Sequence, residues 1–168
     1  MSTHQLYEQY TAQMRKIADV KYALAVLQWD QETYLPPKGN DTRGRQLSTL
    51  SEMAHQLFTE DSTGNLMQEL ASKDGLDDKQ QKNVQRSLED YKKSKKLSSG
   101  FVRTMSDAVN KSFHAWIQAR KDNSFAVFEQ PLDALIQLKK QEADLLGYEQ
   151  HPYNALMNDY DKGLTVEI

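Results

Sequence analysis

The four histidines are the residues of this chain most able to bind a catalytic metal ion. They stand at His4, His55, His114 and His151. A helical zinc site of the H-E-x-x-H type needs two histidines four residues apart, so that both imidazoles project from one face. No two of these histidines have that spacing. The sequence therefore predicts no catalytic, cofactor-binding or metal-binding residue in this chain.

Two of the histidines stand in patterns with a second interpretation. Glu52 and His55 form one Glu-x-x-His pair, which helical di-iron proteins use twice, together with two further glutamates. A second pair is lacking, which favours an ordinary, partly exposed helix position. His151 precedes Pro152 at an expected helix start, where we expect it to cap or pack rather than bind a metal.

Two acidic residues lie beside a large aromatic side chain, in the run Trp29, Asp30, Gln31, Glu32. Paired carboxylates can act as general acid and base when their surroundings separate their pKa values. Positions two apart on a helix do not share a face, however, and both acids stand at the end of a helix, where cations are favoured. We therefore expect a structural salt-bridge corner, with Arg43 and Arg45 as the candidate partners.

A basic run, Lys92-Lys93-Ser94-Lys95-Lys96, has only Tyr91 as an aromatic neighbour. Interaction with nucleic acid is one interpretation of such a run. The chain as a whole carries a net charge of −3, and cations stabilise the last turn of a helix. The pattern favours a solvated helix end, and we expect no nucleic-acid partner.

Composition narrows the class of protein further. The 168 residues include no cysteine, which excludes disulfides and thiolate metal sites. Residues 1–10 lack an apolar run of signal-peptide length, and the longest apolar run, 23–27, is far too short to span a bilayer. We expect a cytoplasmic protein with no membrane partner.

Apolar residues recur at helical spacing along the chain, and no stretch alternates as a strand would. The pattern predicts an all-α multi-helix bundle of about six to seven helices. The predicted segments are 4–34, 40–58, 61–75, 77–96, 99–117, 131–147 and 152–163, with Asp77 and Gln80 as a capping box and Pro131 in a first turn. We expect Val26 and Trp29 to be buried, and Val109, Trp116 and Ile117 to face inward.

The last residues match a helix start. Gly163 closes a helix, Thr165 suits an N-cap, and Glu167 suits a first turn, after which the sequence stops. This favours a fragment of a longer protein, with a frayed natural tail as the alternative.

Two stretches resemble the carboxypeptidase Taq-type metallocarboxypeptidases. Residues 22–37 contain W-D-Q-E-T-x-x-P-P and are followed by an Arg- and Leu-rich segment, Arg43 to Leu50. Residues 147–165 are similar to the family's H-P-Y-x-A-L-x-x-x-Y-x-x-G-x-T segment. The order and spacing agree along essentially the whole chain.

The resemblance implies a mainly helical, zincin-like peptidase that uses zinc or another divalent metal to remove single amino acids from peptide carboxyl ends. In that family the H-E-x-x-H helix lies in a later part of the chain. The resemblance therefore implies that residues 1–168 form a single helical domain, an N-terminal wall or lid of the peptide groove, inactive alone. Peptide substrate would bind only the full-length parent, and a homo-oligomer is compatible with the family. Whether this chain is itself an enzyme stays open.

The alternative is a free-standing helical interaction module without enzymatic activity. Such a module should have a self-sufficient core and no leftover apolar face. A fragment should expose apolar residues that once met the missing part, and the segments around Trp116 and Leu138 are the expected donors.

Overall fold

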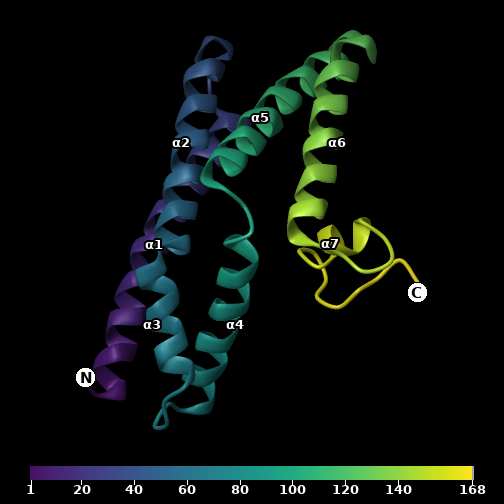
Figure 1. Cartoon of the computed structure of the whole chain (residues 1–168). Coiled ribbons are helices and arrows are strands. Elements are labelled where there is room, and N and C mark those ends of the chain that lie inside the picture. Colours follow the sequence, from purple (N-terminus) through teal and green to yellow (C-terminus); the bar gives the residue numbers. More distant parts are fainter. Residues whose placement is uncertain (168) are drawn as a thin grey trace. The chain divides into compact units, whose positions relative to one another are not determined.

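The computed structural model describes residues 1–167, which form helices and no strand. Figure 1 shows the order of the elements along the chain. Their bounds are α1 (Thr3–Thr33), a 3-10 turn η1 (Pro37–Gly39), α2 (Asn40–Thr59), α3 (Asp61–Ala71), α4 (Asp78–Ser94), α5 (Ser99–Asp122), α6 (Ala126–Leu146) and α7 (Tyr153–Met157). The prediction of an all-α fold with about six to seven helices is confirmed.

The chain divides into two compact units. The first covers Met1–Arg103, and the second runs from Thr104 to the end of the chain. The single domain expected over residues 1–168 stays a prediction, and Ile168 lies outside the described residues.

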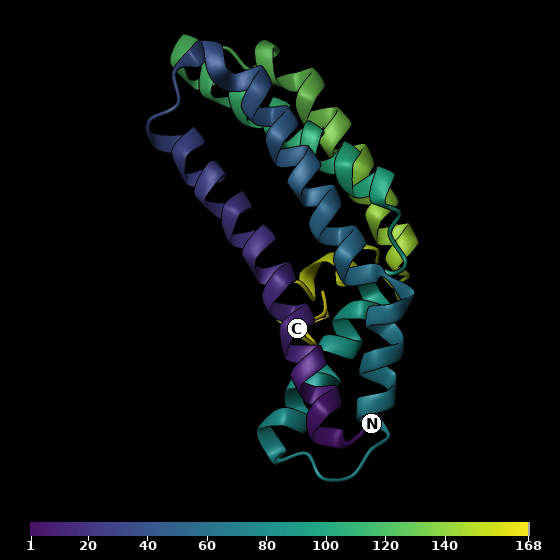
Figure 2. The same ribbon diagram turned by 90° about the vertical axis from the view of Figure 1, so that its left-hand side faces the viewer.

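The first unit is built from α1 to α4 and the start of α5. Figures 1 and 2 show α1 and α2 side by side over the second half of α1, with α3 and α4 beside its first half. Six buried residues form the core where α1, α3 and α4 meet: Leu6, Tyr10, Met67, Leu70, Val84 and Tyr91. The Tyr10 hydroxyl lies 2.8 Å from Ser87 Oγ, and burial raises the pKa of Tyr10. The first half of α1 is therefore held by contacts with helices far away in sequence.

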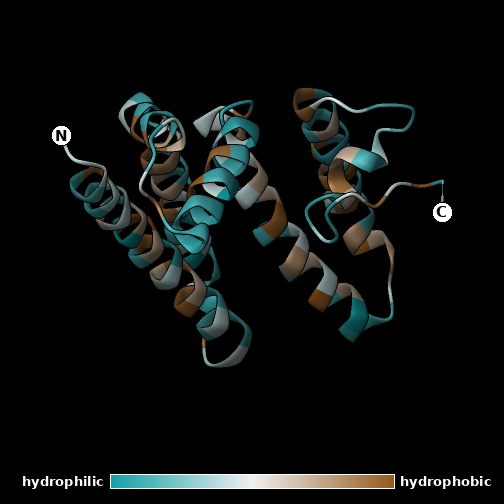
Figure 3. Cartoon of the chain, turned by 90° about the horizontal axis from the view of Figure 1, so that it is seen from below, coloured by the Kyte–Doolittle hydropathy of each residue, from teal (hydrophilic) through white to brown (hydrophobic). Residues whose placement is uncertain are grey.

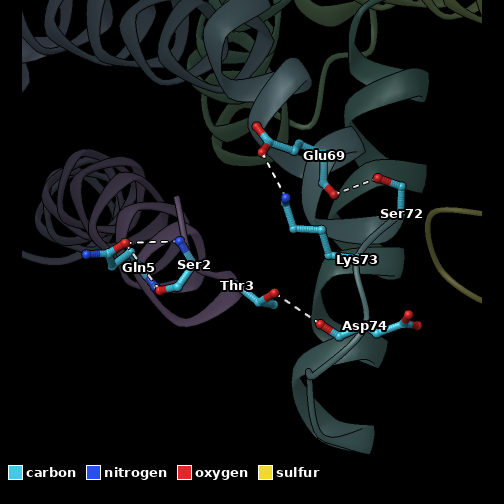
Figure 4. Close-up of polar contacts among 7 residues, drawn as sticks. All are labelled: Ser2, Thr3, Gln5, Glu69, Ser72, Lys73 and Asp74. Atoms are coloured by element: carbon cyan, nitrogen blue, oxygen red, sulfur yellow. Dashed lines mark hydrogen bonds and ion pairs between the residues drawn. The ribbon is translucent and has the colours of Figure 1, made fainter.

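Side-chain caps begin two helices of this unit. Ser2 and Gln5 form a capping box at the start of α1 (Figure 4), and Asp77 and Gln80 form the predicted capping box at the start of α4. The Thr3 hydroxyl donates to the Asp74 carbonyl at 3.0 Å (Figure 4), which joins the start of α1 to the loop between α3 and α4.

α3 begins at Asp61, where the predicted segment 61–75 starts, but the Asp61 side chain does not cap it. Glu60 occupies the N-cap position without a side-chain hydrogen bond, and Asp61 lies in the first turn. The physical reason is that the Asp61 carboxylate accepts a hydrogen bond from Lys95 instead, at 2.7 Å.

The prediction that the second half of α1 is buried on several sides is wrong. Val26 and Trp29 are more than half exposed. A helix of 31 residues is about 46 Å long, and α2 is the helix of the first unit that lies beside its second half (Figures 1 and 2). The side turned away from α2 is therefore left uncovered.

The second unit reverses the predicted orientation of α5. The residues of α5 that are buried are Asn110, Ser112 and Ala119, whereas Val109, Trp116 and Ile117 are exposed. The Ser112 hydroxyl donates to the Pro131 carbonyl at 3.1 Å. Small and polar side chains of α5 are thus the buried ones, and Ser112 among them bonds α6. Figure 3 shows strongly hydrophobic segments along helices of both units.

Two details of α6 and α7 also differ from the prediction. α6 begins at Ala126, so Pro131 lies inside the helix rather than in its first turn. Proline lacks an N–H and removes one helical hydrogen bond there. Gly147 ends α6 with φ 76°, as a helix-terminating glycine does. α7 ends at Met157, earlier than predicted. The chain from 158 to 163 forms turns instead of helix.

The close approach of α3 and α4 predicts the outcome of a glycine substitution. A Cβ atom at Gly64 would clash with the Tyr91 ring, so Gly64→Ala should lower the free energy of unfolding by about 1–3 kcal/mol. Gly100→Ala is the matched control, because nothing lies within 4 Å of its Cβ position, and it should be neutral or slightly stabilising. Urea unfolding followed by circular dichroism measures both variants. Equal free energies of unfolding for Gly64→Ala and Gly100→Ala would contradict the close packing of the Tyr91 ring on Gly64.

Candidate functional site

The acidic pair at the end of α1 forms a structural corner. Thr33 Oγ1 donates to the Trp29 carbonyl at 2.8 Å, and both Tyr34 and Leu35 donate their backbone N–H to the Asp30 carbonyl, at 2.9 and 3.0 Å. The Trp29 and Tyr34 rings meet edge to face, 5.5 Å apart. These contacts close the helix before the Pro36-Pro37 pair, which cannot continue it.

Arg43 from α2 holds this corner. Its Nη2 lies 2.7 Å from Asp30 Oδ2, and its Nη1 donates to the Leu27 carbonyl at 2.6 Å. The guanidinium therefore bonds both a carboxylate and a backbone carbonyl in the last turns of α1. The predicted salt-bridge corner is confirmed for Arg43, whereas Arg45 donates to Thr42 Oγ1 at 3.2 Å instead.

Glu52 and His55 each contact a different residue. Glu52 pairs with Arg103 at 2.9 Å, and His55 Nε2 lies 2.9 Å from the Leu97 carbonyl oxygen, to which it donates. Burial lowers the pKa of His55, the Leu97 carbonyl raises it, and the nearby Lys95 ammonium lowers it again. Both side chains join α2 to the region where α4 ends and α5 begins.

The basic run ends α4, as predicted, with Lys92 and Lys93 in its last turn. The sequence did not indicate the role of Lys95. Its ammonium donates to the Thr59 carbonyl at 2.8 Å and to Asp61 Oδ1 at 2.7 Å, and it lies 5.9 Å from the centre of the Tyr91 ring. The hydrogen bond with Lys95 lowers the pKa of Asp61 and raises the pKa of Lys95. No local sequence signal marks Lys95 for this role, because the two oxygens that it bonds belong to residues more than 30 positions away in the sequence.

The remaining histidines lie apart from one another. His4 Nε2 is 3.4 Å from Glu8 on the exposed side of α1, and His114 lies on α5 with its ring 5.5 Å from that of Phe113. His151 Nδ1 accepts the Tyr153 N–H at 3.2 Å, beside Pro152, which occupies the N-cap position of α7.

These contacts bind helices to one another. Across residues 1–167, no three His, Asp or Glu side chains gather closely enough to hold a metal ion. Within the same residues, no helix combines the length and apolar character needed to cross a membrane.

The corner at Arg43 predicts a charge-specific effect on stability. Asp30→Asn should lower the free energy of unfolding by up to about 1 kcal/mol, because it removes an ion pair whose carboxylate is a third exposed, while Arg43 keeps its hydrogen bonds to Leu27 and Gln46. Glu32→Gln is the matched control, since it removes the same charge from the same exposed helix end. Urea unfolding of both variants measures the difference, which should shrink in high salt.

His55 predicts a pH dependence of stability. A histidine whose folded pKa lies below its ordinary value of 6.5 contributes stability above that pH, and the contribution is lost as the pH falls through the folded pKa. His55→Gln keeps a donor for the Leu97 carbonyl but cannot titrate. The loss of unfolding free energy between pH 7.5 and pH 5 should therefore be smaller in this variant, by about 1 kcal/mol or less, since the ring is only half-buried. Unfolding midpoints at pH 7.5 and pH 5 test this, with His4→Gln as the control that should keep the dependence.

Comparison with known proteins gives this helical arrangement a family. The model of the carboxypeptidase Taq (M32) metallopeptidase family matches residues 9–168. Thermostable carboxypeptidase 1 of Pyrococcus furiosus is 30% identical over 157 residues, covering 94% of this chain and 32% of the relative. Carboxypeptidase 1 of Bacillus subtilis is 26% identical over 169 residues, covering the whole chain and 34% of the relative.

Solved structures agree with these relatives. The crystal structure of BsuCP matches 97% of this chain with a TM-score of 0.93 and 26% identity, covering 33% of that chain. The chain thus spans about a third of the length of the curated relatives it matches. With nearly all its residues matched, this chain belongs to the carboxypeptidase Taq (M32) metallopeptidase family.

Proposed function

We propose that this chain is the N-terminal helical part of a zinc-dependent metallocarboxypeptidase, which releases C-terminal amino acids from peptides. In this proposal the helices form a wall or lid of the peptide groove, and the chain is inactive alone. The observation that carries the proposal is the family match over residues 9–168, combined with coverage of only a third of each relative.

The side chains of the described residues do not fit a catalytic metal. A catalytic zinc site needs three protein ligands and an open position. Here His55 donates to a carbonyl, Glu52 is paired with Arg103, and His151 accepts a backbone N–H. We therefore assign the metal ligands, and with them the peptide-cleaving chemistry, to the part of the polypeptide that the relatives have in addition.

The alternative, a free-standing interaction module, predicted no leftover apolar face. In the second unit, Val109, Trp116 and Ile117 are each exposed by more than two fifths. Large apolar side chains left in water in such numbers are typical of a surface that contacts further protein. This supports a segment of a larger protein over a self-sufficient module.

The proposal predicts a difference in activity between two polypeptides. The 168-residue chain should release no amino acid from an N-blocked peptide and should bind no stoichiometric zinc. The full-length product of its gene should do both, lose activity to a chelator and regain it with zinc. Amino-acid analysis of the reaction and elemental analysis of the protein measure these outcomes.

The control substrate is the same peptide with an amidated carboxyl end, which a carboxypeptidase should leave intact. Amino-acid release by the 168-residue chain would contradict its inactivity. A full-length product that neither binds metal nor cleaves peptides would contradict the proposed function itself.

A further inference from the structure

An apolar stripe runs along the second half of α1. It consists of Tyr22, Val26 and Trp29, and we call these three residues the α1 stripe. Steps of four and three residues place them on one face of the helix. Their exposed fractions are 70%, 62% and 57%, and the adjoining Tyr34 ring, 73% exposed, packs on Trp29.

Nothing in the first unit covers the α1 stripe, although other sides of the same helix segment contact α2. Leu27 lines a cleft with Arg45 and Leu50 of α2, so another side of the same helix segment already packs on α2. The Arg43 guanidinium bonds the Leu27 carbonyl and Asp30, which holds the end of α1 against α2. A helix that is bonded to its neighbour on one side and exposes two aromatic rings and a valine on another is typical of a binding surface.

The length of the relatives indicates what covers this surface. This chain corresponds to about a third of each relative, and its backbone matches BsuCP with a TM-score of 0.93 over 97% of its residues. Resting on the function proposed above, we infer that the α1 stripe is an intramolecular docking surface. Its occupant is an apolar segment from the remaining two thirds of the M32 polypeptide.

The small size of the α1 stripe favours this occupant over a second copy of the chain. Two aromatic side chains and a valine offer roughly 500 Å² of surface, below the about 800 Å² per partner of a stable complex between separate proteins. A segment of the same polypeptide needs less area, because its translational freedom is already restricted by the chain.

Introduced cysteines test the inference, since residues 1–168 contain no cysteine of their own. Val26→Cys is close to isosteric, and Glu89→Cys on the exposed side of α4 is the control. Labelling by a maleimide is followed by peptide mass spectrometry, in the 168-residue chain and in the full-length, peptide-cleaving product of the gene. In the short chain both cysteines should react equally fast, whereas in the full-length protein Cys at 26 should react at least about tenfold more slowly than the control.

Other outcomes would overturn the inference. Equal labelling at both positions in an active full-length protein would show that the α1 stripe stays exposed there. Protection that appears in the short chain as its concentration rises would identify a second copy as the occupant. Protection of the full-length protein only when peptide is added would identify the substrate. A full-length product without carboxypeptidase activity, or a gene that ends at Ile168, would instead reject the proposed function on which the inference rests.

Discussion

The contact between the backbone of α3 at Gly64 and the ring of Tyr91 sets the geometry of the first unit. Only a residue without a Cβ lets the ring lie this close, and this close approach draws α4 against α3. Leu70 and Met67 are then sealed from water, and the Phe58 ring packs on the other side of Tyr91, 6.2 Å away. The first half of α1 completes the core with Leu6 and Tyr10. The contact thus helps to form the surface on which α1 buries these two residues.

Much of the fold could be predicted because its signals are local. The capping box at Asp77 and Gln80, the helix-ending prolines and Gly147 each act within a few residues. The ion pair of Asp30 with Arg43 could also be predicted, because the chain turns sharply between them and opposite charges favour proximity. The family could be recognised because residues 22–37 and 147–165 carry its motifs in the same order and at the same spacing.

The rest could not be predicted because it depends on what lies opposite each face. Val26 and Trp29 have the spacing of a core face, yet α2 covers only one side of the helix that carries them. Ser112 and Asn110 look like surface residues, yet they are buried in the second unit. An amphipathic pattern shows that a face will be covered by something, but it cannot show whether the cover belongs to the same segment of chain. Lys95 was missed for a related reason, since its two partners stand more than 30 residues away along the sequence.

The hydrogen bonds of α1 also set an order of events during synthesis on the ribosome. Thr3 is bonded to a residue 71 positions later, and Tyr10 to one 77 positions later. At about 5–20 residues per second, the ribosome needs roughly 4–15 seconds to make the partners of Tyr10 after Tyr10 itself. A helix of 31 residues is long enough to form before then, so α1 emerges as a solitary helix with apolar residues on more than one face. A chaperone that binds apolar segments would therefore find a target in α1 before the core of the first unit exists.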